Sequence, residues 1–223
     1  MNRTRTALLA LLATITLPGL AACSGSGNAG TAHTGSAAVV GAQRISIATV
    51  EDQVSAFRAA APAQGGGPGS NQPFGQDSAG LPSNVLAFLI QSQLVQTALD
   101  QKGLQVSATD VEAHEAPYLR SAGGEQQLTA QFVSQLGYPP QDLEPYFRWR
   151  AGRDALLQNA GGAGLTDPNA QIAKLDDLLR PVAANLGISV NPRYGSWDAT
   201  SLSLGNASQP WIKQVSQDGT GQG

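Results

Sequence analysis

The sequence has little of the chemistry on which most enzymes and metalloproteins depend. Its 223 residues include one cysteine, Cys23, and two histidines, His33 and His114. A single cysteine excludes an intramolecular disulfide and a metal site built on several thiolates. His33 lies among small residues and His114 among glutamates, so no Ser-His-Asp set is predicted, and GxSxG, P-loop and HExxH patterns are absent. We expect no catalytic residues, no metal ligands and no cofactor.

Charged residues are also scarce. Asp, Glu, Lys and Arg make up 13% of the chain, and the formal net charge is −3. Proteins that bind nucleic acid usually concentrate Lys and Arg on one face, and this composition does not favour such a face. We therefore expect no nucleic-acid partner.

The N-terminus has an apolar run from Ala7 to Leu17, preceded by Arg3 and Arg5. This run is shorter than the roughly 20 residues needed to span a bilayer. A positively charged start, a short apolar run and small residues after it are typical of a secretory signal peptide. The sequence therefore predicts a signal peptide over residues 1–22.

The end of this segment, LAAC at residues 20–23, resembles the lipobox of bacterial lipoproteins. The resemblance implies cleavage between Ala22 and Cys23 and lipidation of the Cys23 thiol, which explains the single cysteine. Acyl chains stabilise membrane binding by about 0.8 kcal/mol per buried CH₂. We expect a protein anchored by lipid to the cell membrane, on its extracytoplasmic face.

Composition divides the rest of the chain. Residues 23–36 are rich in Gly and Ser and predict a flexible tether. Residues 37–204 predict one folded domain, and residues 205–223 a largely disordered tail. Inside the domain, the Gly- and Pro-rich residues 63–80 predict a disordered surface loop or, alternatively, a mobile flap over a binding surface.

Six helical segments are predicted from apolar spacing and capping residues. The first and third begin with capping boxes, Thr49 with Asp52 and Ser107 with Asp110. Pro181 should kink or restart the sixth. The predicted segments are Thr49 to about Pro62, Leu81 to Gly103, Ser107 to about Ser121, a segment around Leu128 that ends at Gly137, a segment that follows Pro140, and Asp167 to Leu186.

The chain on either side of the helices has strand-like patterns. Ala37–Ser46 predicts two short extended pieces around a turn at Gly41, and Ile188 and Val190 alternate as in a strand. A lone strand leaves its amides unpaired, so its natural partners are the extended pieces within Ala37–Ser46. The predicted fold is mainly α: a six-helix cradle with a small two- or three-stranded antiparallel ribbon that joins the N- and C-terminal ends of the domain.

Together these stretches resemble a known family. AAVVGAQRISIATVEDQVSAF (residues 37–57), the helices after it, and LGISVNPRYGSWD (residues 186–198) are similar to the N-terminal chaperone module of SurA/PrsA-type proteins, in particular small bacterial lipoproteins of this kind. The resemblance implies that Ala37–Val40 pairs with Ile188–Asn191 and that the helices hold extended or unfolded polypeptide. Larger members insert a parvulin prolyl-isomerase domain before the final strand, whereas here Leu186 and Gly187 run directly into Ile188. Isomerase activity is therefore not expected.

A polypeptide-binding surface needs apolar side chains and adaptable polar groups. Between Val85 and Ile90 apolar residues point in every direction, so this half-helix is either buried on all sides or exposes an apolar patch. The stretch Arg148–Arg153 is predicted to be a solvated flank whose stems pack on Trp149. The candidate binding residues are Val85, Leu86, Phe88, Leu89, Ile90, Tyr138, Tyr146, Phe147 and Trp149. The alternative is that all nine are ordinary core residues.

Two functional hypotheses follow. The first is a membrane-tethered, non-catalytic module that binds unfolded or extended exported polypeptides. The second is a lipoprotein that docks one specific folded partner in an envelope assembly through the same helical surface. An enzyme is the least supported class, because no catalytic constellation is found.

Overall fold

A computed structural model describes residues 34–61 and 80–205. The predicted signal peptide, the Cys23 lipidation site, and nearly all of the tether, loop and tail lie outside the described residues. The elements are β1 (Ser36–Val40), β2 (Gln43–Ser46), α1 (Ile47–Ala60), α2 (Leu81–Gln101), α3 (Ala108–Ala122), α4 (Glu125–Gln131), the π-helix η2 (Phe132–Leu136), the 3₁₀ turn η3 (Pro140–Asp142), α5 (Leu143–Asn159), α6 (Pro168–Leu186), β3 (Ser189–Val190), β4 (Ser196–Asp198) and β5 (Ser203–Gly205). The fold is mainly helical with two small antiparallel sheets, which confirms the predicted class.

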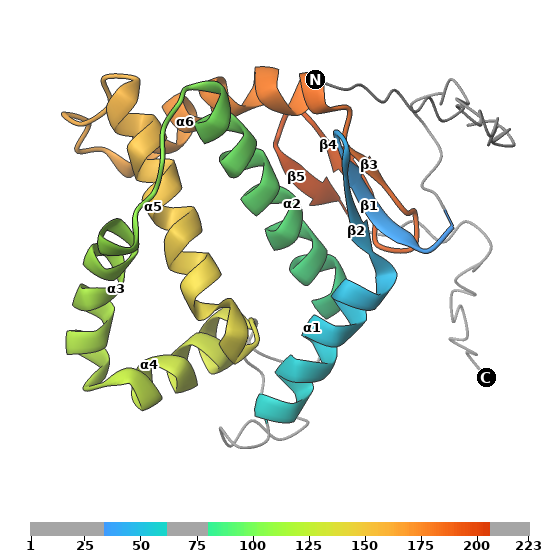
Figure 1. Ribbon diagram of the computed structural model, residues 1–223, viewed down its shortest axis with the longest axis horizontal. Helices are drawn as coiled ribbons and strands as arrows, with labels where there is room; N and C mark the ends of the chain where they lie inside the picture. The colour runs from blue at the N-terminus through green and yellow to red at the C-terminus, as the bar shows by residue number, and fades with distance from the viewer. Residues whose placement is uncertain (1–33, 62–79, 206–223) are drawn as a thin grey trace, which may run out of the picture.

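Helix α2 lies at the centre of the arrangement (Figure 1). Its first half packs with α1 and the strands in one core of mostly aliphatic residues, which also includes Phe57 and which we call the aliphatic core. Its second half packs with α5 and α6 in another, which includes Leu94, Leu156 and Leu179. Helices α3 and α4 lie on the far side of α5 from the strands (Figure 1). The single long apolar helix therefore connects the strand end of the molecule to its helical end.

Strand β1 is the middle strand of the three-stranded sheet, in the order β2-β1-β3. The closing strand β3 pairs antiparallel with β1, with Ala38 opposite Val190 and Val39 opposite Ser189. This confirms the predicted joining of the two ends. Strand β1 begins at Ser36, one residue before the predicted domain boundary. The Ser36 side chain is fully buried, so this residue belongs to the folded domain.

The turn after β3 fixes the end of the sheet to α2. Asn191 donates its backbone N–H to the Ala37 carbonyl (2.8 Å), and its own carbonyl accepts from the Tyr194 N–H (2.9 Å). The Tyr194 side chain is only 3% exposed, and the Tyr194 carbonyl accepts a 2.7 Å hydrogen bond from the Ser83 hydroxyl at the start of α2. Pro192 and Gly195 suit this turn, since proline has a fixed φ and Gly195 has a φ of 132°.

A second hairpin, β4–β5, was not predicted from the sequence. Trp197 lies opposite Leu204, and both pack against the first aliphatic core. Gly205, assigned by the sequence to the tail, is the last residue of β5. Strands of three residues carry too short an alternation to be recognised, and the packing of Trp197 stabilises this pair instead.

Two local predictions need correction. Helix α1 begins three residues early, because Ser46 is its N-cap and accepts from the Thr49 N–H (2.9 Å). Helix α6 does not restart at Pro181, since it is continuous from Pro168 to Leu186 with the exposed Pro181 inside it. The capping box of Ser107 and Asp110 on α3 is confirmed. No helix among the described residues is long and apolar enough to cross a membrane.

Candidate functional site

The candidate residues in the apolar block of α2 are buried except at Leu89. Val85, Leu86 and Ile90 are at most 1% exposed and belong to the aliphatic core around β1 and α1, and Leu89 packs against that core from a partly exposed position. Phe88 points the other way, toward α5, and is also buried. Of the two alternatives for this half-helix, burial is the one observed. Apart from the partly exposed Leu89, these side chains lie beneath the surface and do not form part of it.

The aromatic candidates come together around Phe88. The chain has five Phe, four Tyr and three Trp, and seven of these twelve residues form one continuous set of ring contacts. We call this set the aromatic cluster: Phe88, Tyr118, Phe132, Tyr138, Tyr146, Phe147 and Trp149. A sequence poor in aromatic residues therefore concentrates them between α2, α3, η2 and α5.

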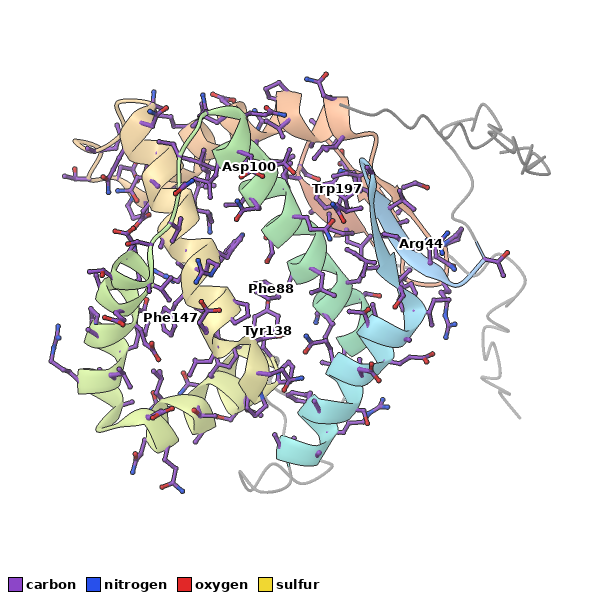
Figure 2. All side chains as sticks on the ribbon, viewed as in Figure 1. Arg44, Phe88, Asp100, Tyr138, Phe147 and Trp197 are labelled. Carbon is purple, nitrogen blue, oxygen red and sulfur yellow. The ribbon has the colours of Figure 1, made fainter. Side chains whose placement is uncertain are left out.

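An irregular backbone places Tyr138 in the cluster. After α4 the chain widens into the π-helix η2, and Gly137 ends it with a φ of 74°. Pro139 is extended, so the following helical turn starts in a new direction. Tyr138, held between these two residues, faces Phe88 with ring centroids 4.9 Å apart (Figure 2). Short π-helical segments are frequent at functional sites.

Tyr146 on α5 connects the rest of the cluster. Its ring lies 5.4 Å from those of Phe132 and Phe147 and 5.8 Å from that of Trp149. Phe147 is buried on the side of α5 that faces α3, where it meets Tyr118. Tyr138, Tyr146 and Trp149 are half-buried, and Tyr118 is 40% exposed. The cluster therefore has a buried floor and a partly exposed edge.

Two arginines of α5 lie on the rings of this cluster. The Arg150 guanidinium lies 5.3 Å from the Tyr118 centroid and 5.8 Å from that of Tyr146, and it donates to the Tyr146 hydroxyl (3.3 Å). Arg153 lies 4.5 Å from the Trp149 centroid. Arg153 contacts Trp149 through its guanidinium, and both arginines are half-buried, so the predicted solvated flank is wrong for these two residues.

Sequence reasoning missed these arginines as site residues. The available signal was spacing: Tyr146 with Arg150 and Trp149 with Arg153 are each four residues apart, which brings side chains together on one helix face. Phe132 and Tyr118 were also missed as site residues. Their membership depends on how η2 and α3 pack against α5, which local spacing does not predict.

A buried carboxyl, Asp142, lies at the start of α5 and is 3% exposed. Gln53 of α1 donates to its Oδ1 (2.8 Å), while Oδ2 has no partner among the described residues. Burial raises the pKa of Asp142 to about 6, against the Gln53 hydrogen bond, which lowers it. The group ties α1 to α5 at the base of the aromatic cluster.

The other titratable groups form no metal site within the part of the chain that the structure describes. His114 Nε2 lies 3.5 Å from Asp154 Oδ2, a single contact between α3 and α5. Asp176 and Asp177 both lie beside Arg180 on α6. The arrangement offers apolar, aromatic and guanidinium contacts, which suit binding of a polypeptide more than bond-breaking chemistry.

A family model described as a SurA-like N-terminal domain matches residues 1–157. No curated protein and no solved structure matches the chain, and no parvulin domain is detected in it. The match ends within α5, so α6 and the closing strands lie beyond it. Their place in the module rests on the pairing of β3 with β1.

Proposed function

Because the chain belongs to the family of SurA-like N-terminal domains, a chaperone-type module, we propose that it binds unfolded or extended polypeptides after their export and catalyses no reaction on them. The observation that carries this proposal is the partly exposed edge of the aromatic cluster. Aromatic rings bury a large area and lose few rotamers on binding, so they suit contacts with many different sequences.

The nine candidate residues divide between two roles in this proposal. The partly exposed side chains contact the client, and these are Leu89, Tyr138, Tyr146 and Trp149. The buried side chains hold the surface from beneath, and these are Val85, Leu86, Phe88, Ile90 and Phe147. Burial of apolar client side chains gains about 25 cal/mol per Å². A few hundred Å² of contact would thus give weak, reversible binding, which suits a chain that has to be released.

We also propose that Cys23 is lipidated and that the protein works at the extracytoplasmic face of the cell membrane. The motivating observation is the LAAC sequence at residues 20–23. Cys23→Ser should release the protein from the membrane fraction or leave residues 1–22 uncleaved. Unchanged partitioning into detergent by a processed Cys23→Ser protein would contradict the anchor and leave the binding proposal intact.

The binding proposal is tested by aggregation of an unfolded reference protein. The chain from residue 23 onward, carrying Cys23→Ser, is mixed at equimolar ratio with reduced α-lactalbumin, and light scattering is followed. We expect clear suppression of scattering. Scattering equal to that with an inert globular protein would contradict the proposal, and prolyl-isomerase activity on a proline peptide would contradict its non-catalytic part.

A further inference from the structure

Arg150 and Arg153 line one pocket between α5 and α6. The pocket has a volume of about 250 Å³, and its apolar wall is formed by Leu157, Ile172 and Leu175. Ile172 is 49% exposed, one of the few large apolar side chains at the surface of the described residues. The two arginines are half-buried and border an aromatic ring on one side and this pocket on the other.

Among residues 34–61 and 80–205, no carboxylate lies within ion-pair distance of the Arg150 or Arg153 guanidinium. By contrast, Arg148 pairs with Glu144, and Arg180 pairs with Asp176 and Asp177. Arg150 bonds only to the Tyr146 hydroxyl, and Arg153 contacts the face of Trp149. An arginine does not lose its charge to relieve burial, so each half-buried guanidinium stays positive, with Asp154 favouring that charge from beyond ion-pair distance.

The two charges also oppose each other. Positions three apart on a helix are neighbours, and like charges there are destabilising. Burial, and then the charge of Arg150, lower the pKa of Arg153. The guanidinium groups themselves lie over the rings of Tyr118, Tyr146 and Trp149, which hold them in place, and both arginines also line the pocket.

Two acidic groups, Asp154 and Asp176, lie near the arginines and favour their charge, and each also has a closer contact with another basic side chain. Asp154 lies at the pocket but is 3.5 Å from His114 Nε2, on the α3 side of α5. Asp176 lies in the adjoining pocket, which also includes Trp149 and Arg153, and is 3.9 Å from the Arg180 guanidinium. The pocket lining therefore keeps two arginines against one aspartate, an excess of positive charge in a chain whose net charge is negative.

We propose that this pocket binds the side-chain carboxylate of a glutamate or aspartate in an extended client polypeptide, with a neighbouring apolar client side chain on Ile172. The proposal rests on the proposed function, in that the ligand is a polypeptide. It adds a sequence preference: the protein binds client segments in which an acidic residue lies beside an apolar residue. Arginine suits this role because its planar group accepts a carboxylate in bidentate fashion while it stays on an aromatic ring.

The test compares two fluorescent octapeptides of alternating leucine and alanine, blocked at both ends. One has a central glutamate and the other a glutamine, and binding to the chain from residue 23 onward, carrying Cys23→Ser, is measured by anisotropy. We expect the glutamate peptide to bind about tenfold more tightly, the low end of what a charge-assisted hydrogen bond contributes. Raising the salt concentration should narrow the difference.

Two variants test whether Arg153 causes the preference for the glutamate peptide. Arg153→Met keeps the apolar stem on Trp149, and it should bring the glutamate peptide to the affinity of the glutamine peptide. The matched control is Arg148→Met, which removes an arginine of the same helix that already has Glu144 as its partner; it should leave the tenfold preference unchanged. Thermal melting of each variant checks that the fold is retained, and the peptide comparison on the unaltered protein needs no variant.

Three results overturn the proposal: equal affinity of the two peptides, an equal loss of preference with Arg148→Met, or binding of neither peptide. A glutamate preference that emerges only when the chain is shortened to end at Gly205 also overturns it, because the protein's own C-terminal residues would then occupy the pocket. If the two peptides bind with equal affinity but the protein still suppresses aggregation of α-lactalbumin, only the preference for acidic residues is refuted. If the glutamate peptide is preferred but aggregation is not suppressed, the proposed function is refuted.

Discussion

The strand end of the molecule, around β1 and β3, and the aromatic cluster differ in their side chains and in their backbone, although both depend on α2. Around β1 and β3 the core side chains are mostly aliphatic, with Phe57 and Tyr194 among them, and the backbone is bonded across the ends of the domain, as at Asn191 and Ala37. Around Tyr146 the side chains are aromatic, half-buried and covered by arginines, and the backbone includes a π-helix. Leu86 faces the first region and Phe88 the second, two residues apart on one helix.

This difference separates stability from binding. A close-packed aliphatic core gains most from complete burial. Half-exposed rings contribute less burial free energy to folding, but they leave a surface on which another chain can pack. If the contrast is correct, substitutions at the strand end should change the free energy of unfolding, and those at the edge of the aromatic cluster should change client binding.

The largest expected effect is at Leu86, which is fully buried at the strand end. Leu86→Ala leaves a cavity and should lower the free energy of unfolding by about 3 kcal/mol, measured by urea denaturation. Leu136→Ala on η2, a leucine that is 41% exposed, is the control and should cost much less. Similar losses for the two variants would contradict the assignment of the α2 block to the core.

The second-largest effect on stability is expected in the closing strand β3. Val190 pairs with Ala38 and packs against the aliphatic core from a half-buried position. Val190→Asp places a charge there and should cost about 2 kcal/mol of unfolding free energy, measured as a fall in the melting temperature. Val190→Thr keeps the β-branched shape and should cost less. An unchanged melting temperature for Val190→Asp would refute the pairing of the two ends.

Asp142 links the two regions and gives stability a pH dependence. Its pKa of about 6 in the folded chain exceeds the ordinary value of 3.8, so the fold favours the protonated form. This contribution is fully present below about pH 4 and is lost as pH rises toward 6. Asp142→Asn, which keeps an acceptor for Gln53, should therefore stabilise the protein at pH 7.5 by about 1 to 2 kcal/mol.

Denaturation at pH 4 and pH 7.5 checks this expectation. The gain from Asp142→Asn should be present at the higher pH and absent at the lower one. Asp52→Asn, which removes one exposed carboxyl from α1, is the control and should change stability little at pH 7.5. A gain of equal size for Asp142→Asn at both pH values would show that the Asp142 carboxylate is not disfavoured by the fold.

The smallest effect on stability should come from the edge of the aromatic cluster. Tyr118 is 40% exposed, so Tyr118→Ser should lower the free energy of unfolding by less than about 1 kcal/mol. It should nevertheless weaken suppression of aggregation, because it removes a ring and exposes Arg150 to water. Leu136→Ser, an exposed apolar residue outside the cluster, should leave suppression unchanged. Equal suppression by both variants would contradict the role of this edge.

The helices and the joining of the ends could be predicted because their signals are local. Ser107 with Asp110 marks the start of α3, and the alternation of Ile188 and Val190 marks a strand that needs a partner. The β4–β5 hairpin could not be predicted, since Trp197 stabilises it through contacts with residues far away in the sequence. The Ser46 cap was missed for a different reason: the neighbouring Thr49 and Asp52 offered an equally good local pattern.

The candidate site was predicted in part. The residue types were informative, because Tyr138, Tyr146, Phe147 and Trp149 do meet in one cluster with Phe88. Burial was not predictable, because the sequence does not say which side of α2 the strands cover. The arginines were taken as solvated flank residues because their packing against rings depends on α3 and α6, which the spacing along α5 does not reveal.

The most direct test of the central claim is photo-cross-linking in cells from the edge of the aromatic cluster. A photoreactive phenylalanine replaces Tyr138, and a matched protein carries it at Arg120, an exposed position on α3. We expect Tyr138 to yield a broad set of unfolded exported polypeptides and Arg120 to yield few. One dominant, stoichiometric partner from Tyr138 would instead establish a lipoprotein that docks a single folded protein, and it would contradict the chaperone account.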